Sequence, residues 1–257
     1  WLAEVIPTSG TLTTKAKITA ISTAGGMIIE GFEVTCLIGG QPIYVMKTVF
    51  GFFPAASLAN QVGITPTDED RRRLHEPCDF SVTLRPETPA RYGAGAPRLP
   101  GGKLLMLDRV TGLWPNGGAK GLGRIRSEKD VDNAEWFFKA HFFSDPVQPG
   151  SLGLEALVQL LQFWMIHTDQ GAGMASPRFE PLMLGRPLTW KYRGQVAPHN
   201  KIIRGELDIV EVGTDARGRF AVADGYLWVD ELRIYQAIGL ALRLVDEPPP
   251  TDAGVRE

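Results

Sequence analysis

The sequence has few residues of the kinds that mark disulfide-rich, metal-binding or membrane-spanning proteins. Its 257 residues include two cysteines, Cys36 and Cys78, and four histidines. Two cysteines this far apart fit neither a zinc-ligand spacing nor a disulfide framework, so a reducing, cytoplasmic setting is expected. No apolar run of about 18 residues is present, so no membrane span is expected. No secretory signal peptide is evident either.

Neither positive nor negative charge is in large excess. The formal net charge is −2, and the longest basic run is Arg71-Arg72-Arg73, so no nucleic-acid-binding surface is expected. Hydrophobic residues make up 44% of the chain and charged residues 22%, which is typical of a globular protein. The length allows one large domain or two modest ones.

The most informative feature of the organisation is an internal repeat. When the first fifty residues are moved by 191 positions, they align with a later segment without a gap and with matching apolar positions. Self-similarity at a fixed offset indicates a duplicated structural unit. The aligned pairs are Val5 with Val196, Pro7 with Pro198, Ile18 with Ile209, Thr23 with Thr214, Ile43 with Ile234 and Tyr44 with Tyr235.

Both copies are rich in β-branched residues that partly alternate with polar ones, which predicts strands. In the first copy the strands are expected at 11–22, 27–38 and 42–52, with Gly25-Gly26 and Gly39-Gly40 in the turns. In the second copy they are expected at 201–212, 219–229 and 232–244.

These patterns divide the chain into four segments. Residues 1–63 form a partial unit of strands without a helix, 64–96 a connector rich in Pro, Arg and Glu, 97–247 a complete unit, and 248–257 a linker. The second copy follows a helix and the first does not. We therefore expect the chain to be a piece of a longer polypeptide.

One long helix is expected at 150–166. Pro149 lies just before it, where a missing N–H costs little. Its residues are apolar on nearly every face, which is typical of a buried helix. Ser151, Glu155, Gln159 and Gln162 are the exceptions and share one stripe. A carboxylate on a buried helix needs a partner, so Glu155 is either a functional acid or a residue held by a structural hydrogen bond.

The residues before this helix could supply a base and an oxyanion site. His141 follows an aromatic stretch, 136–140, that we expect to be extended. Gly150 and Ser151 offer backbone N–H groups at the helix N-terminus, where developing negative charge is stabilised. A metal site with His141 and Asp145 is the competing interpretation. Pro146 and Pro149 disfavour a helical ligand pair, and no third ligand is apparent.

Several motifs resemble the 3-hydroxydecanoyl-acyl carrier protein dehydratase family. The motifs are Trp136-Phe137-Phe138, His141-Phe142, Asp145-Pro146-Val147, Pro149-Gly150, Leu152-Gly153-Leu154-Glu155-Ala156, Leu105-Met106-Leu107-Asp108-Arg109-Val110, Gly194-Gln195-Val196 and Ala223-Asp224-Gly225. Residues 25–29 and 48–53 look like the dehydratase region of polyunsaturated fatty acid synthases. The resemblance implies an α+β hot-dog fold, in which an antiparallel sheet wraps one long central helix, here as a partial double hot-dog.

The resemblance also implies catalytic roles for His141 as base and Glu155 as acid. Isomerising members of the family have Asp and Cys where this chain has Glu155 and Ser151, so double-bond isomerisation stays open. The expected reaction is dehydration of a 3-hydroxyacyl thioester to the 2-enoyl thioester during fatty acid synthesis. The expected substrate-binding residues are Val147, Gly150, Ser151 and Gln159.

The resemblance implies substrate delivery on the phosphopantetheine arm of an acyl carrier protein, without a metal or other cofactor. In this family the acid of one unit faces the His of another, so a homodimer or a pseudo-dimer of hot-dog units is expected. Two alternatives remain at this point. One is a hot-dog thioesterase, and the other is a non-catalytic hot-dog scaffold or acyl-binding domain.

Overall fold

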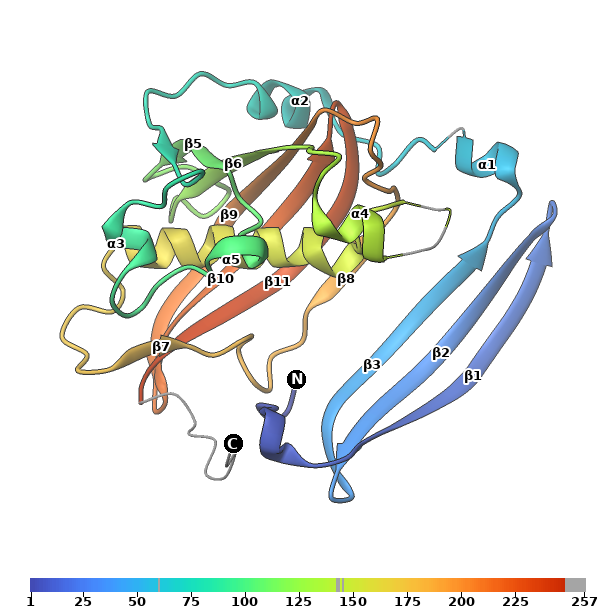
Figure 1. Cartoon of the computed structure of the whole chain (residues 1–257), viewed down its shortest axis with the longest axis horizontal. Coiled ribbons are helices and arrows are strands. Elements are labelled where there is room, and N and C mark those ends of the chain that lie inside the picture. Colours follow the sequence, from blue (N-terminus) through green and yellow to red (C-terminus); the bar gives the residue numbers. More distant parts are fainter. Residues whose placement is uncertain (60, 142–143, 145, 248–257) are drawn as a thin grey trace. The chain divides into compact units, whose positions relative to one another are not determined.

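A computed structural model of the chain describes residues 1–59, 61–141, 144 and 146–247 (Figure 1). The chain divides into two compact units. The first contains Trp1–Gln61 and Met183–Pro187, and the second contains Val62–Leu182 and Leu188–Glu247. No helix in the described ranges has both the length and the hydropathy needed to cross a bilayer.

The first unit is built around a three-stranded antiparallel meander. Its elements are the 3-10 helix η1 (Pro7–Ser9), strands β1 (Leu12–Ala24), β2 (Met27–Ile38) and β3 (Gln41–Phe52), and the short helix α1 (Ala55–Ala59). Gly25-Gly26 and Gly39-Gly40 form its two hairpin turns, and all four have positive φ. Two-residue turns of this kind require φ > 0 at both positions, which glycine adopts without strain.

The two faces of this meander differ in chemistry. One face carries Lys15, Lys17 and Thr13 from β1, with Glu33 of β2 opposite Lys17. The other carries Leu12 and Ile18, which are 53% and 54% exposed. A sheet with one polar and one apolar face is the pattern of a sheet that covers a core on one side.

The second unit carries the larger sheet and the long helix. Its helices are α2 (Asp68–Leu74), α3 (Ala90–Gly93), η2 (Gly102–Leu104), α4 (Trp136–Ala140) and α5 (Gly150–His167). Its strands are β4 (Val82–Thr83), β5 (Arg109–Trp114), β6 (Arg124–Asp130), β7 (Pro177–Phe179), β8 (Thr189–Tyr192), β9 (Ile202–Asp215), β10 (Gly218–Val229) and β11 (Leu232–Asp246). They pair antiparallel in the order β4-β5-β6-β9-β10-β11-β7, and β8 also pairs with β11.

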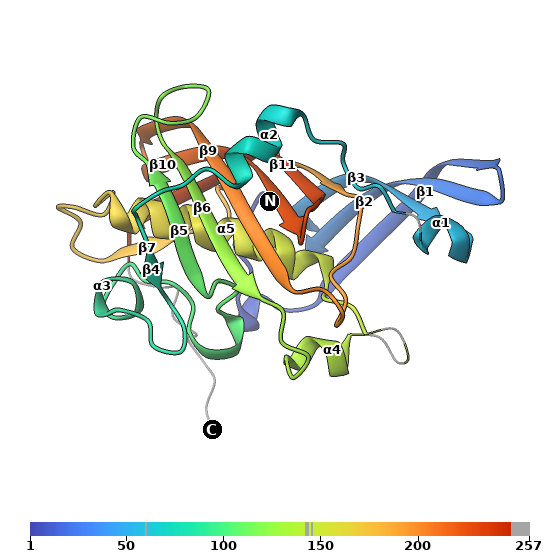
Figure 2. The ribbon, with the colours of Figure 1, turned by 90° about the horizontal axis from the view of Figure 1, so that it is seen from above.

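The helix α5 lies across the sheet and forms the core with it (Figures 1 and 2). Leu157, Leu160 and Phe163 of α5 are fully buried, as are Leu207 and Leu227 of the sheet. Burying a side chain of this size contributes roughly 1.5–3 kcal/mol, so the helix and the sheet stabilise each other. A curled antiparallel sheet around one long helix is the hot-dog arrangement, and the predicted helix at 150–166 is confirmed to within one residue.

The internal repeat extends to the pairing of individual residues. When β2 is moved by 191 positions it becomes 218–229, which are the bounds of β10. The pair Ile18–Phe32 then coincides with Ile209–Ala223. Both first strands skip one residue directly after this pair, at the same repeat position, and form a β-bulge there. The two meanders therefore share strand order and the register of their first two strands. The second and third strands share register near their common turn, and β11 then slips by one residue at an additional irregularity.

The segment that leads into each meander is also repeated. In the first unit the Leu2 N–H donates to the Ile43 carbonyl at 2.8 Å, and in the second the equivalent Arg193 N–H donates to Ile234 at 2.8 Å. The ring pair Trp1–Tyr44 has a centroid distance of 4.6 Å and an interplanar angle of 40°. The equivalent pair Tyr192–Tyr235 has 5.0 Å and 40°.

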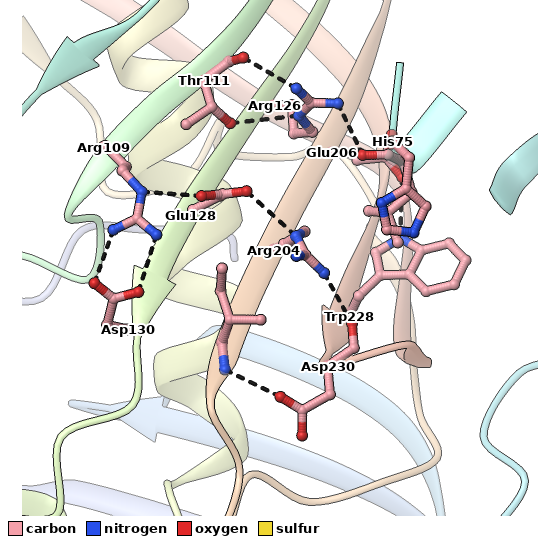
Figure 3. Close-up of polar contacts among 12 residues, drawn as sticks. His75, Arg109, Thr111, Arg126, Glu128, Asp130, Arg204, Glu206, Trp228 and Asp230 are labelled. Carbon is pink, nitrogen blue, oxygen red and sulfur yellow. Dashed lines mark hydrogen bonds and ion pairs between the residues drawn. The ribbon is translucent and has the colours of Figure 1, made fainter. Parts of the chain in front are cut away.

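Residues 64–96, expected as a connector, pack on the second unit, where Leu74, Leu84 and Tyr92 are buried. The sheet face opposite α5 is rich in arginine, and these arginines bind the segment's backbone carbonyls. Arg126 donates to Leu74 and Glu76 at 2.8 and 2.9 Å. A related ion-pair chain on this face joins side chains from three strands (Figure 3), namely Arg109, Asp130, Glu128 and Arg204.

The expectation that residues 136–140 are extended is wrong. They form the one-and-a-half-turn helix α4, and the His141 N–H continues it by donating to the Phe137 carbonyl at 2.9 Å. Aromatic residues favour strands by local propensity. Here Phe137 and Phe138 are both buried, and tertiary packing of two successive rings overrides that preference.

Candidate active site

The residues expected to carry chemistry lie around the N-terminal end of α5. Figure 1 shows α4 and β8 at this end of the helix. Pro149 precedes the first helical residue, Gly150, in an extended conformation (ψ 131°). The fixed φ of proline suits this position. The N–H groups of Gly150 and Ser151 thus lie in the first turn of α5, at the positive end of the helix dipole.

Glu155 lies in the second turn of α5 and is partly buried. Burial raises the pKa of its carboxyl, and a hydrogen bond from Gln159 partly offsets the rise. Loss of solvent favours the neutral acid over the carboxylate. The carboxyl is therefore suited to donate a proton.

Gln159 fixes the orientation of Glu155. Its side chain is fully buried, and its Oε1 accepts the Met106 N–H at 2.7 Å. Its Nε2 must then be the donor, and it donates to Glu155 Oε1 and to the Leu104 carbonyl, each at 2.8 Å. Because Glu155 Oε1 accepts this hydrogen bond, the acidic proton of Glu155 belongs on Oε2.

His141 is held by a second contact. It caps the C-terminal end of α4, and its Nδ1 lies 3.0 Å from the Val147 carbonyl. A carbonyl only accepts, so Nδ1 carries the hydrogen, and the lone pair of the neutral tautomer is then on Nε2. Val147 is buried, and the neighbouring Gln148 N–H donates to Val196 at 2.9 Å. The loop before α5 thereby sets the tautomer of His141.

An aromatic wall packs against the first turns of α5, and the sequence did not predict it. A Cβ on Gly150 would lie 3.0 Å from Tyr192 and 3.4 Å from Trp190, and one on Gly153 only 2.2 Å from Tyr235. Position 153 must therefore be glycine for the helix to approach so closely, and a side chain at position 150 would press on the ring of Tyr192. A glycine inside a helix costs about 0.5–1 kcal/mol relative to alanine, and Gly153 was the available signal for such an approach.

The structure thus holds each expected catalytic side chain with a partner of its own, Glu155 with Gln159 and His141 with Val147. The Ser151 side chain is exposed. Among the described residues, no group of three or more His, Cys, Asp or Glu side chains is placed to hold a metal ion. Asp145, named in the metal alternative, lies outside the described residues, as does Phe142 of the family motif.

Among known proteins, one of the subunits that make up the polyunsaturated fatty acid synthase of Thraustochytrium sp. (strain ATCC 26185 / S-3) is 31% identical over 252 residues. The alignment covers 91% of this chain and 16% of that protein, so the chain spans about one sixth of the relative's length.

Two solved structures are also similar to the chain. The CurJ dehydratase, an inactive mutant in complex with a compound, has a TM-score of 0.49 and 15% identity, and covers 95% of this chain and 72% of its own. The dehydratase heterocomplex ApeI:P from Xenorhabdus doucetiae has a TM-score of 0.39 and 12% identity, and covers 56% of this chain and 85% of its own.

A family model described as the FabA-like domain matches residues 99–238. This range includes His141, Val147, Gly150, Ser151, Glu155 and Gln159. Since the match covers more than half of the sequence, the chain belongs to the FabA-like domain family, as its motifs predicted.

Proposed function

We propose that the second unit dehydrates a 3-hydroxyacyl thioester to the 2-enoyl thioester. The observation that carries this proposal is the raised pKa of Glu155 at the start of a helix, beside a loop that fixes the tautomer of His141. An acid kept protonated and a neutral imidazole with its lone pair on Nε2 are the two groups that an elimination of water requires.

In the proposed reaction His141 Nε2 removes a proton from C2 of the acyl chain. The C2–H electron pair forms the C2=C3 double bond as the C3–O bond breaks. Glu155 Oε2 gives its proton to the departing hydroxyl, which leaves as water. Proton exchange with solvent then returns His141 to the neutral form and Glu155 to the acid form.

The thioester oxygen gains negative charge during this step. The Gly150 N–H, with that of Ser151, would stabilise it at the positive end of the helix dipole. The substrate would arrive on the phosphopantetheine arm of an acyl carrier protein. This arm supplies the thioester linkage, and His141 and Glu155 carry out the two proton transfers with the substrate.

The proposal is tested by turnover of a 3-hydroxyacyl thioester by three proteins: the parent chain, His141→Ala and Glu155→Gln. Each substitution should lower the rate at least about a hundredfold, the scale for losing a positioned acid or base. The Gln side chain keeps the shape of Glu155 and its hydrogen-bonding capacity but has no acidic proton. The circular dichroism spectra of the folded proteins should be unchanged, which separates chemistry from folding.

The product identifies the reaction class. A 2-enoyl thioester supports the proposal, and a shifted double bond would add isomerisation to it. Release of the free thiol would indicate a thioesterase instead, and no turnover by the parent chain would indicate a scaffold or acyl-binding domain. If Glu155→Gln kept near-normal dehydration, Glu155 would be a structural residue.

We also infer that the first unit is the sheet of a second hot-dog unit. Its meander repeats the strand order of β9–β11 and the register of β9–β10, and its apolar face corresponds to the face that covers α5. Within the described residues of that unit, the longest helix is the five-residue α1. Analytical ultracentrifugation tests the expected association with another hot-dog unit. A chain that is monomeric and fully active would contradict the expectation that it associates with another hot-dog unit.

A further inference from the structure

The segment Gly102–Met106 is bound by side chains along its whole length, and none of its residues is part of the proposed chemistry. Each of its first four carbonyls accepts a hydrogen bond from a side chain. The donors are Arg85 to Gly102 at 3.3 Å, Trp136 to Lys103 at 3.2 Å, Gln159 to Leu104 at 2.8 Å, and Arg85 again to Leu105. We call this segment the brace.

The brace determines the position of Gln159. The Met106 N–H and the Leu104 carbonyl are the two backbone groups that fix the Gln159 amide, and with it the donor that faces Glu155. A displaced brace would leave the amide free to turn its oxygen toward the carboxyl. The turned amide oxygen would instead accept the acidic proton of Glu155, which would then no longer be assigned to Oε2 for transfer to the substrate.

The brace is also attached to the element that carries His141. Trp136 is the first residue of α4, and its indole N–H donates to the brace. Glu135, directly before it, accepts from Arg85 at 3.2 Å and from the buried Lys129 at 2.6 Å. The helix that ends at His141 is thus held by the same arginine that holds the brace.

Arg85 has the geometry for this task and is itself held in place. Its backbone N–H donates to the Asp108 carbonyl at 3.1 Å, and its Nε lies 3.6 Å from the Asp108 carboxylate. The planar guanidinium can reach carbonyls and carboxylates in several directions at once, which a lysine ammonium cannot reproduce. Arg85 lines a groove of about 620 Å³ that also contains Arg109.

We propose that Arg85 and Trp136 are positioning residues, which act through the brace to set the Gln159–Glu155 hydrogen bond and the placement of α4 before His141. This inference rests on the proposed dehydration. The geometric part can be tested without turnover, because the carbonyl stretching band of protonated Glu155 reports its hydrogen bond directly.

The test compares Arg85→Lys and Trp136→Phe with the matched control Arg109→Lys. Arg85→Lys keeps the positive charge, and Trp136→Phe keeps an aromatic ring. Arg109 lines the same groove but pairs with Glu128 and Asp130 on the sheet. The infrared band of Glu155 is identified as the one lost in Glu155→Gln.

In both brace variants the Glu155 band should shift, and kcat should fall about ten- to a hundredfold, the scale of a small misplacement of catalytic groups, with KM within about twofold. The control should keep the parent band and rate. If the band stays in place in both brace variants, the inference is wrong, even where melting or kcat falls. If the band shifts although Glu155→Gln retains turnover, the brace stands and the proposed role of Glu155 as the acid fails. If the band shifts although the parent chain has no turnover, the brace stands and the proposed function fails.

Discussion

The meanders β1–β3 and β9–β11 have the same strand order, and their first two strands have the same register, but their apolar faces have opposite surroundings. Ile209 of β9 is fully buried, whereas the equivalent Ile18 of β1 is 54% exposed. Ile203 is 4% exposed and the equivalent Leu12 is 53% exposed. The strands supply an apolar face in both meanders. In the second unit, α5 packs on the apolar face of β9–β11. The alternation of residues therefore specifies a face, and the helix turns that face into a core.

The largest expected effect is a loss of stability in the buried meander, β9–β11. Ile209→Ala should lower the free energy of unfolding of the second unit by about 2–5 kcal/mol, because it leaves a cavity against α5. Ile18→Ala should change stability by no more than about 0.5 kcal/mol, as for other exposed substitutions. Denaturant titration of both variants measures the difference. An equal loss for Ile18→Ala would show that the first face is covered as well.

A smaller loss of stability is expected where α5 packs against the ring of Tyr235. Gly153→Ala would place a methyl group 2.2 Å from Tyr235, and overpacking of this kind costs about 1–3 kcal/mol. The loss should appear in thermal unfolding. Combining it with Tyr235→Leu should recover part of the loss, whereas Tyr44→Leu, at the equivalent position of the first unit, should recover none. Recovery by both would contradict a local clash.

The smallest effect is electrostatic and follows from the partial burial of a carboxyl on α5. Burial raises the folded-state pKa of Glu155 above its unfolded value, against the opposing Gln159 hydrogen bond. Such a group costs stability as pH rises from the unfolded pKa through the folded pKa, because the folded state resists losing the proton. Glu155→Gln has no proton to lose in this range.

The stability of Glu155→Gln relative to the parent chain should therefore increase with pH across that window and then level off. Urea denaturation at stepwise pH values measures this difference. Glu87→Gln is the matched control because it removes the same charge from an exposed position. A difference that does not vary with pH would mean that Glu155 is solvated in the folded chain.

The sequence predicted the regular parts of this fold well. The strands of both meanders and the helix α5 have strong local signals, namely β-branched runs ended by turn residues and one apolar run after Pro149. The connector was harder to interpret because its arginines and prolines resemble a solvated segment. Only the folded sheet shows that its Leu74 and Leu84 are buried.

The site was predicted in part for a similar reason. Motif residues such as His141 and Glu155 stand in a recognisable local order, so they could be named without coordinates. Arg85 and Trp136 donate hydrogen bonds to the brace from other segments of the chain. Any residue type can supply a backbone carbonyl that accepts a side-chain hydrogen bond. The sequence alone therefore could not identify the contacts of the brace.

The shared β-bulge has a consequence for ancestry. A bulge changes which face every later residue of its strand points to, so it can be lost or gained only with a coordinated change in the residues that follow. Both copies keep it at the same repeat position, although most of the surrounding side chains differ. Duplication of one unit, which the sequence repeat predicts, accounts for a bulge at the same position in both copies.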